Sequence, residues 1–300
     1  MRLVYVVLIA AAACSRPVAS TIDNHAVSAA GEPADPERAR AASFQPTAFS
    51  VEVRGHGRPI ILIPGLGCPS SVWDGMVAHL HGYETHQLTL AGFAGRPRID
   101  APLSKTTVDE LARYIRDRHL QSPVIVGHSL GGSIAYALAA REPMLVGPTI
   151  VVDAGAPAAT ADADTKAAAA QIRDMWSEAS DERFVQQIKD IFGQMSVKPE
   201  RLQPMLAEVA KSDRRAIGDA IYELSTTNMR SELGNIRSPV LLVLADGALQ
   251  DDFRQQAAGV HNREVVVVRN TGHFVMIDDP EGFFAAVDDF LAKHELLAAE

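Results

Sequence analysis

The feature that most constrains the fold is an apolar segment that ends in a serine flanked by glycines and then continues as a helix-forming segment. Residues Pro123–Val126 have the pattern of a buried strand, Gly-His-Ser-Leu-Gly follows at Gly127–Gly131, and Gly131–Ala140 favours a helix. The chain must turn from strand to helix within a few residues, which places Ser129 on a tight, strained turn. A side chain on either flanking glycine would collide with neighbouring backbone. The segment therefore predicts a strand–turn–helix unit that presents the Ser129 hydroxyl above a sheet.

Candidate strands and helices alternate along the chain from residue 49 onward. The candidate strands are Phe49–Val53, Pro59–Ile63, His86–Leu90, Pro123–Val126, Thr149–Val152, Val240–Leu244 and Val265–Val268. Helices are expected at Ser71–Leu80, from Thr107, where Glu110 completes a capping-box spacing, and from Pro280, which follows the N-cap residue Asp279. This alternation predicts a mostly parallel sheet with helices on both faces.

Residues 155–238 interrupt the alternation, because they contain no strand candidate and several amphipathic helical segments. About eighty helical residues between two strands predict a cap over the active face of the sheet. The expected organisation is a core formed by residues 49–154 and 239–300, with a helical cap at 155–238.

The N-terminus has the pattern of an export signal. Arg2 precedes the apolar run Leu3–Ala13, which is too short to span a bilayer, so residues 1–13 are interpreted as a signal peptide. The small residues before Cys14 resemble a bacterial lipoprotein lipobox, in which the cysteine is acylated; plain secretion with cleavage near Cys14 is the alternative. Residues 14–48 indicate a flexible tether. We therefore expect an exported bacterial protein in the periplasm or cell envelope, attached to the membrane through Cys14.

Composition excludes several other classes. The net charge is −9, which disfavours the phosphate backbone of nucleic acid as a partner. The two cysteines, Cys14 and Cys68, cannot form a disulfide framework, and no Cys/His cluster has zinc spacing. We expect neither a metal nor an organic cofactor.

A serine hydroxyl is a weak nucleophile and needs a base. Of the ten histidines, His273 follows the last predicted strand, and a loop there can reach the sheet edge at which Ser129 lies. His128 is the nearest rival, but a neighbour in the turn points away from the serine. His56 is expected to be a turn residue. His273 is therefore the candidate base.

The tetrahedral intermediate of acyl transfer needs two hydrogen-bond donors for its oxyanion. The N–H of Leu130, the residue after the nucleophile, is one candidate. The Leu66 N–H in the loop Pro64-Gly65-Leu66-Gly67 is the other, because the glycines let the backbone approach a substrate.

Four motifs together resemble the α/β-hydrolase superfamily over residues 49–295: PGLG followed by Trp73, LTLAGFAG at 88–95, GHSLGG at 127–132 and TGHF at 271–274. The resemblance implies an α/β-hydrolase fold with a mostly parallel central sheet, a nucleophile elbow and a helical cap between strands six and seven. Two positions depart from the family pattern: Thr89 stands where the family has aspartate, and Ala94-Gly95 replaces the second glycine.

The resemblance also implies an acid that orients the histidine. The family pattern places it shortly after the seventh strand, but no aspartate falls in that register here. Asp246 is the first choice, because the 27 residues before His273 leave room for a helix and a strand. Asp251, only 22 residues before His273, and Asp153, directly after the strand Thr149–Val152, remain alternatives. Some lipases of the superfamily take their acid from that last position.

The leading hypothesis is a serine hydrolase that cleaves a carboxylic ester of a small molecule through an acyl-enzyme, with Ser129 attacking and His273 removing its proton. Lactonase, C–C hydrolase, aminopeptidase and perhydrolase chemistry would use the same residues. The alternative outside enzyme function is a non-catalytic binding module that kept the fold. The sequence names neither the substrate nor the oligomeric state.

Overall fold

The computed structural model describes residues 44–159 and 162–295. The predicted signal peptide, the proposed lipid attachment at Cys14 and residues 14–43 of the predicted tether lie outside the described residues. Within the described ranges, no helix combines the length and the apolarity needed to cross a bilayer.

The described residues contain one seven-stranded sheet in the order β1-β3-β2-β4-β5-β6-β7. Only β1 runs antiparallel to its neighbour, β3, and every other pair is parallel. The strands are β1 Phe49–Gly55, β2 Arg58–Ile63, β3 Tyr83–Leu90, β4 Val124–His128, β5 Thr149–Val152, β6 Val240–Ala245 and β7 Arg263–Val268. All residues of β4, β5 and β6 are buried, as expected for central strands of a parallel sheet. The predicted mostly parallel sheet is confirmed.

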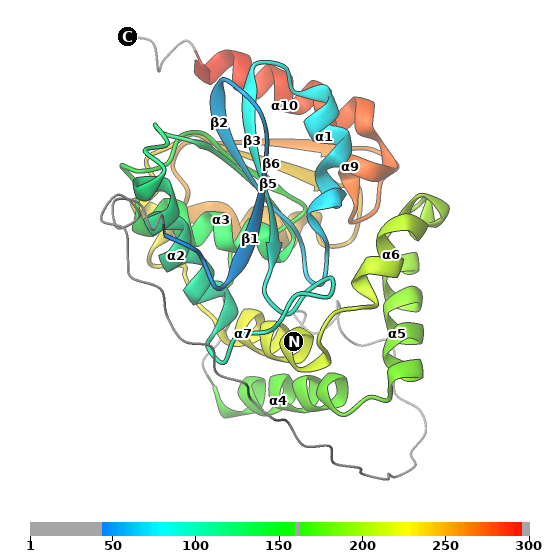
Figure 1. The fold of residues 1–300 in the computed structure, drawn as a ribbon. Coiled ribbons are helices and arrows are strands. Elements are labelled where there is room, and N and C mark those ends of the chain that lie inside the picture. Colours follow the sequence, from blue (N-terminus) through cyan, green and yellow to red (C-terminus); the bar gives the residue numbers. More distant parts are fainter. Residues whose placement is uncertain (1–43, 160–161, 296–300) are drawn as a thin grey trace, which may run out of the picture. The chain divides into compact units, whose positions relative to one another are not determined.

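Helices cover both faces of this sheet (Figure 1). The helices α1 (Asp74–His79), α9 (Val275–Asp278) and α10 (Pro280–Glu295) gather on one side, and α2 (Leu103–Asp117) and α3 (Leu130–Arg141) lie on the other. A further helix, α8, spans Gln250–Gln256, and short 3-10 turns occur at η2 (Ser70–Trp73), η3 (Pro199–Leu202), η4 (Leu233–Asn235) and η5 (Ala257–Gly259). This layered arrangement completes the α/β-hydrolase fold.

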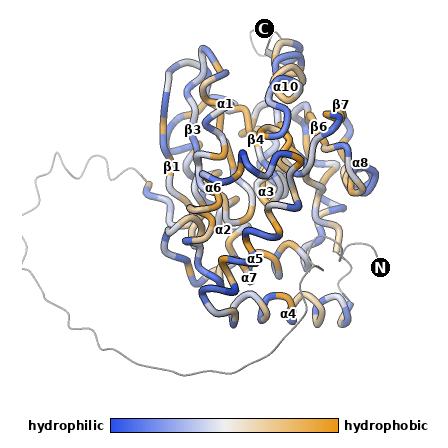
Figure 2. Tube along the Cα trace, turned by 90° about the vertical axis from the view of Figure 1, so that its right-hand side faces the viewer, coloured by the Kyte–Doolittle hydropathy of each residue, from blue (hydrophilic) through white to orange (hydrophobic). Residues whose placement is uncertain are grey.

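Helix α10 begins as its sequence predicts. Asp279 Oδ1 accepts the Gly282 N–H at 3.2 Å, and Pro280 is the first helical residue. Figure 2 shows hydrophobic and hydrophilic residues alternating along α10. The apolar side buries Phe283, Val287 and other residues, and these fix the helix against the sheet.

Helix α2 begins four residues earlier than predicted, at Leu103 rather than Thr107. Its first N–H groups are capped from a distant part of the chain, because the Glu223 carboxylate accepts from Ser104 and Lys105 at 2.9 and 3.0 Å. Glu110, assigned to a capping box, instead accepts N–H groups before β1. The prediction of the N-terminus was wrong because the capping group comes from another helix.

Four helices lie between β5 and β6 in the chain and gather at one end of the sheet (Figure 1). They are α4 Ala163–Ser177, α5 Asp181–Gln194, α6 Gln203–Val209 and α7 Arg214–Thr226. We call the segment 155–238 that contains them the cap. Five strands precede the cap within the described residues, where the family resemblance implied six.

One joint between the cap and the core lies at the loop after β3. The Asp213 N–H donates to Gly92 O at 2.8 Å, and the Ala94 N–H donates to Ser212 Oγ at 3.0 Å. A Cβ on Gly92 would lie 2.2 Å from that of Ala216, so the start of α7 sits directly on this loop. We call this contact the α7 joint.

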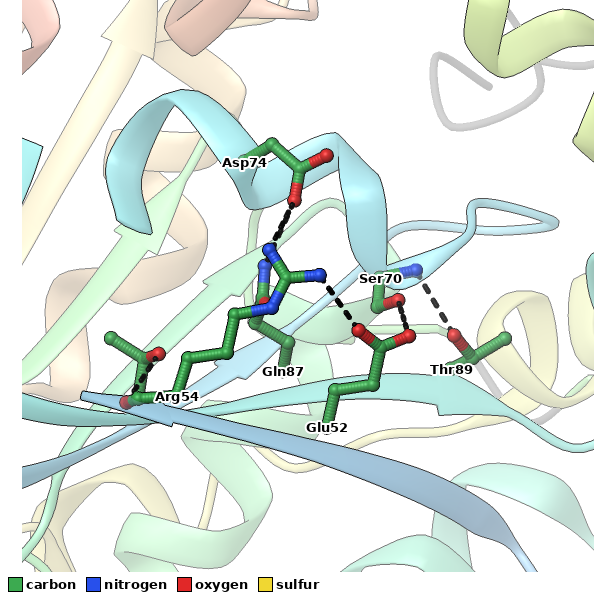
Figure 3. Close-up of polar contacts among 7 residues, drawn as sticks. Glu52, Arg54, Ser70, Asp74, Gln87 and Thr89 are labelled. Carbon is green, nitrogen blue, oxygen red and sulfur yellow. Dashed lines mark hydrogen bonds and ion pairs between the residues drawn. The ribbon is translucent and has the colours of Figure 1, made fainter. Parts of the chain in front are cut away.

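Thr89, one of the two positions that depart from the family pattern, lies at one end of a polar cluster (Figure 3). Thr89 Oγ1 accepts the Ser70 N–H at 3.0 Å, and the Ser70 hydroxyl donates to Glu52 at 3.2 Å. Arg54 bridges Glu52 and Asp74 at 2.9 and 3.4 Å. Thr89 therefore holds the start of η2, which follows the loop that contains Leu66.

Candidate active site

Ser129 lies on the predicted strained turn between β4 and α3. Its φ is 54° and its ψ is −118°, a conformation that a residue with a side chain rarely adopts. A Cβ on Gly127 would lie 2.1 Å from Gly131 O, and a Cβ on Gly131 would lie 2.2 Å from Ile63 O. The predicted need for both glycines is confirmed. The Ser129 side chain is half-buried and lies at the N-terminus of α3, where a developing negative charge is favoured.

His273 lies in the loop after β7 and bonds to a buried aspartate. His273 Nδ1 and Asp153 Oδ2 are 2.7 Å apart, and the Asp153 side chain is 8% exposed. The other carboxylate oxygen, Oδ1, accepts the Ala245 N–H at 2.9 Å. Asp153 directly follows β5 and has a φ of 43°. The carboxylate is thus fixed by the end of β6 and aims its free oxygen at the imidazole.

The structure pairs His273 with Asp153, one of the two alternatives, and not with Asp246, the first choice. Asp246 follows β6 and is exposed, and Asp251 is exposed in the first turn of α8. Neither carboxylate bonds to His273 among the described residues. The physical reason lies at the carboxyl edge of the sheet: the Ala245 N–H at the end of β6 binds the Asp153 carboxylate from the neighbouring strand, whereas Asp246, the next residue, is exposed.

The two proposed oxyanion donors belong to segments that meet at Ser129. Leu66 occupies a turn closed by the Cys68 N–H on Gly65 O at 3.1 Å. A Cβ on Gly65 would lie 3.3 Å from Ser129 Cβ, so this turn packs against the elbow. The Leu130 N–H is the first of α3 and has no acceptor one helical turn earlier. The loop that contains Leu66 and the first residue of α3 therefore both lie next to Ser129.

His128 holds the backbone of the candidate base. Its Nε2 lies 2.9 Å from His273 O, and the two rings are 4.6 Å apart between centroids. A carbonyl oxygen only accepts, so Nε2 carries the proton and Nδ1 is a bare acceptor facing Gly65. Burial, reinforced by nearby His273, holds the pKa of His128 well below its ordinary value. His128 is therefore a neutral donor that fixes the loop.

Cys68 lies two residues after Leu66, and its thiol donates to Leu66 O at 3.6 Å. The side chain is 1% exposed, and burial raises the pKa of its thiol to about 12, so almost no thiolate forms near neutral pH. Cys68 is a buried structural residue. The described residues contain no group of three or more His, Cys, Asp or Glu side chains that could hold a metal ion.

Apolar residues of the cap pack against two loops next to the site. A Cβ on Gly67 would lie 3.1 and 3.2 Å from Val209 and Ile217, which places both over the loop that contains Leu66. On the other side, the Phe192 ring is 5.6 Å from that of Phe274, the residue after His273. All four side chains are buried, so they form apolar packing between the cap and the loops that carry Leu66 and His273.

Sequence reasoning missed two residues that contact the His273 loop. His128 was judged only as a rival base, and its hydrogen bond to His273 O was not foreseen. Asp278, completely buried, accepts the Gly272 N–H at 2.7 Å. The available signal was the pair of carboxylates, Asp278 and Asp279, directly after the apolar run Phe274–Ile277.

Comparison with known proteins identifies the family. The profile of the Alpha/beta hydrolase family matches residues 60–287. The chain belongs to the Alpha/beta hydrolase family. Over 252 residues it is 26% identical to a pimeloyl-[acyl-carrier protein] methyl ester esterase from Nitrosomonas europaea, covering 79% of this chain and 97% of that protein. The hydrolase family therefore includes esterase relatives that match most of this chain.

Solved structures support the fold assignment. An esterase from Thermogutta terrifontis has a TM-score of 0.71 and 17% identity, covering 82% of this chain and 94% of its own. The enol-lactonase from Burkholderia xenovorans has a TM-score of 0.68 and 17% identity, covering 81% and 96%. At this level of identity the likeness concerns the fold.

Proposed function

We propose that this α/β hydrolase cleaves a carboxylic ester of a small molecule through an acyl-enzyme, with Ser129 as nucleophile, His273 as base and Asp153 as acid. The observation that carries the proposal is the 2.7 Å hydrogen bond between His273 Nδ1 and the buried Asp153 carboxylate. Because Nδ1 donates to Asp153, Nε2 is left as the acceptor that a base needs.

In the acylation step, Ser129 Oγ attacks the ester carbonyl carbon while its proton passes to His273 Nε2. The carbonyl oxygen becomes an oxyanion that accepts from the N–H groups of Leu66 and Leu130. His273 then donates the proton to the leaving alcohol as the C–O bond breaks. A water molecule, deprotonated by His273, attacks the acyl-enzyme; the proton returns to Ser129 and the carboxylic acid is released.

The electrostatic contribution of Asp153 follows from its position. The imidazolium that forms during each step lies next to a carboxylate that is largely shielded from water, where charge attraction is stronger than in solvent. The Ala245 N–H prevents this carboxylate from turning away. Asp153 thus stabilises both the orientation and the positive charge of His273.

The proposed substrate is an ester with an apolar portion on at least one side of the scissile bond. The packing near the site supports this, because the side chains that the cap places against the two site loops are buried and apolar: Val209 and Ile217 at Gly67, and Phe192 at Phe274. The named activity of the Nitrosomonas europaea relative, a methyl ester esterase, supports ester chemistry in particular. The binding-module alternative rested on a misplaced acid and loses that support, because Asp153 supplies one.

A fluorophosphonate probe tests the proposal directly. It should label the wild-type protein at Ser129, and the Ser129→Ala variant should remain unlabelled. The wild type should also hydrolyse p-nitrophenyl esters, with a chain-length profile that defines the apolar portion. Folded wild-type protein without labelling or turnover would instead favour a non-catalytic binding module.

We also propose that the chain is exported and anchored through a lipid on Cys14. The export pattern of residues 1–13 and the small residues before Cys14 support this. Palmitate labelling in a bacterial host should disappear in Cys14→Ser. Labelling that persists in that variant would exclude Cys14 as the attachment point.

A further inference from the structure

The buried carboxylate of Asp278 bonds back to the loop that carries His273. Asp278 is the last residue of α9, and its Oδ2 accepts the Gly272 N–H at 2.7 Å. The residue is completely buried, with an exposed fraction of 0%. Because Gly272 directly precedes His273, this hydrogen bond fixes the peptide that leads into the base.

The same carboxylate binds the cap segment Met195–Lys198. It accepts the Ser196 hydroxyl in a short hydrogen bond, the Val197 N–H at 3.2 Å and the Lys198 N–H at 3.3 Å. The Lys198 ammonium adds a hydrogen bond to the backbone oxygen of Asp278 at 2.5 Å. With the Gly272 N–H, four donors surround one carboxylate, which compensates for its removal from water.

The cap segment also bonds to the backbone of the base itself. The His273 N–H donates to Met195 O at 2.6 Å. A Cβ on Gly272 would lie 2.5 Å from the same oxygen, so the two chains touch without room for a side chain. On the opposite side, His128 Nε2 donates to His273 O at 2.9 Å. The base is therefore held at its N–H by the cap and at its C=O by the elbow strand.

We propose that Asp278 is a positioning residue for His273, which joins the cap segment Met195–Lys198 to the catalytic loop so that the alignment of the base depends on the cap. The inference rests on the proposed serine hydrolase function. Misplacement of a reacting group by about 1 Å can reduce the rate about 100-fold, so a loosened loop has a measurable cost. A carboxylate is required because both of its oxygens accept hydrogen bonds. In asparagine, the side-chain NH2 would face the surrounding donors and could not accept from them.

The charged and titratable groups around this joint are few. His273 faces Asp153 and His128. On the α9 side, the Lys198 ammonium and the Arg201 guanidinium both bond to backbone oxygens, of Asp278 and of Ile277 at 3.1 Å. The carboxylate of Asp278 is therefore held by neutral donors, and its replacement leaves these two backbone contacts in place.

The test compares Asp278→Asn with Asp279→Asn in the full-length protein. Asp279 is the adjacent carboxylate, whose side chain caps α10 through Gly282. Asp278→Asn should reduce the fluorophosphonate labelling rate and the kcat for a short p-nitrophenyl ester by about 10–100-fold, with KM little changed. It should also shift the limb of the pH–rate profile that reports His273. Asp279→Asn should lower Tm and leave the labelling rate, kcat and the pH profile unchanged.

Proton NMR gives a second readout that does not depend on activity. The proton between His273 and Asp153 should resonate far downfield in the wild type and in Asp279→Asn, and should shift or broaden in Asp278→Asn. If Asp278→Asn does not fold, Ser196→Ala tests the proposal in its place, because this variant removes one donor on the cap side and keeps the carboxylate. Ser196→Ala should slow labelling several-fold and perturb the same resonance.

The outcomes separate the two proposals. Equal labelling rates and resonances in Asp278→Asn and Asp279→Asn, or an unchanged Ser196→Ala where that variant decides, would overturn the positioning role. Wild-type protein that is not labelled would contradict the serine hydrolase proposal alone, because the NMR comparison still decides the inference.

Discussion

The two sides of the candidate site are held in different ways. Ser129 is placed by its own segment, a strand, two glycines and a helix that are contiguous in the chain. His273 is placed by residues from three distant segments: Asp153 after β5, His128 at the end of β4, and Met195 in the cap. The nucleophile therefore depends on local backbone geometry, and the base depends on tertiary contacts.

The cap also joins the core in different ways at two of its contacts. At the α7 joint, Asp213 and Ser212 bond to the loop after β3, and Ala216 packs closely against Gly92. At the other joint, a buried carboxylate, Asp278, gathers donors from both sides. This difference suggests that a change in the cap near α7 alters substrate fit, whereas a change near Met195–Lys198 alters the chemistry.

The largest expected effect is the loss of the nucleophile. Ser129→Ala should lower kcat for a p-nitrophenyl ester by about 10⁶-fold, because the remaining groups only bind and polarise the substrate. Wild-type protein that has been inactivated with the fluorophosphonate should hydrolyse the ester at the same residual rate as Ser129→Ala. Substantial turnover in folded Ser129→Ala would identify a different nucleophile.

A substitution at a single glycine tests whether local backbone geometry places Ser129. Gly131→Ala places a Cβ 2.2 Å from Ile63 O and should destabilise the protein by about 3 kcal/mol or more, measured by chemical denaturation. Gly193→Ala is the matched control, because no atom lies within 4 Å of its Cβ and the residue is inside α5. The control should be neutral or stabilising by up to about 1 kcal/mol. Equal effects in both variants would mean that the elbow is not sterically constrained.

The contrast between local and distant contacts also explains what the sequence could predict. The seven strands, the elbow glycines and the start of α10 follow from patterns within a few residues. All were predicted, although the strand bounds differ by up to three residues, as for β3, which begins at Tyr83 rather than His86. The start of α2 was missed because Glu223 of α7 caps it. The aspartate that bonds to His273 was not the first choice, because the spacing before His273 counts residues along the chain, whereas Asp153 reaches His273 across neighbouring strands.

Two buried neutral histidines should make the free energy of unfolding depend on pH, a smaller effect than those above. Burial lowers the pKa of both His128 and His86 below the ordinary value of 6.5. Below that pH the unfolded chain binds protons that the folded protein excludes, so the stability these histidines contribute is lost as pH falls from 6.5. The slope is up to about 1.4 kcal/mol per pH unit for each proton.

Urea denaturation at several pH values from 7.5 to 5 checks this expectation. His86→Gln, which alters a histidine on β3 away from His273, should reduce the acid-induced loss of stability without changing the pH–rate profile. His128→Gln should reduce the same loss and also lower kcat, because it disturbs the His273 carbonyl contact. An unchanged acid sensitivity in both variants would argue that neither histidine is excluded from protonation in the folded protein.

The central claim is that the carboxylate of Asp153, directly after β5, orients His273. The most direct test compares Asp153→Asn with Asp246→Asn. Asp153→Asn should lower kcat by about 10⁴-fold, because the amide leaves His273 in the wrong tautomer. Asp246→Asn should retain wild-type kcat, because its side chain is exposed and outside the network. The account is contradicted if Asp246→Asn loses activity by orders of magnitude while Asp153→Asn stays active.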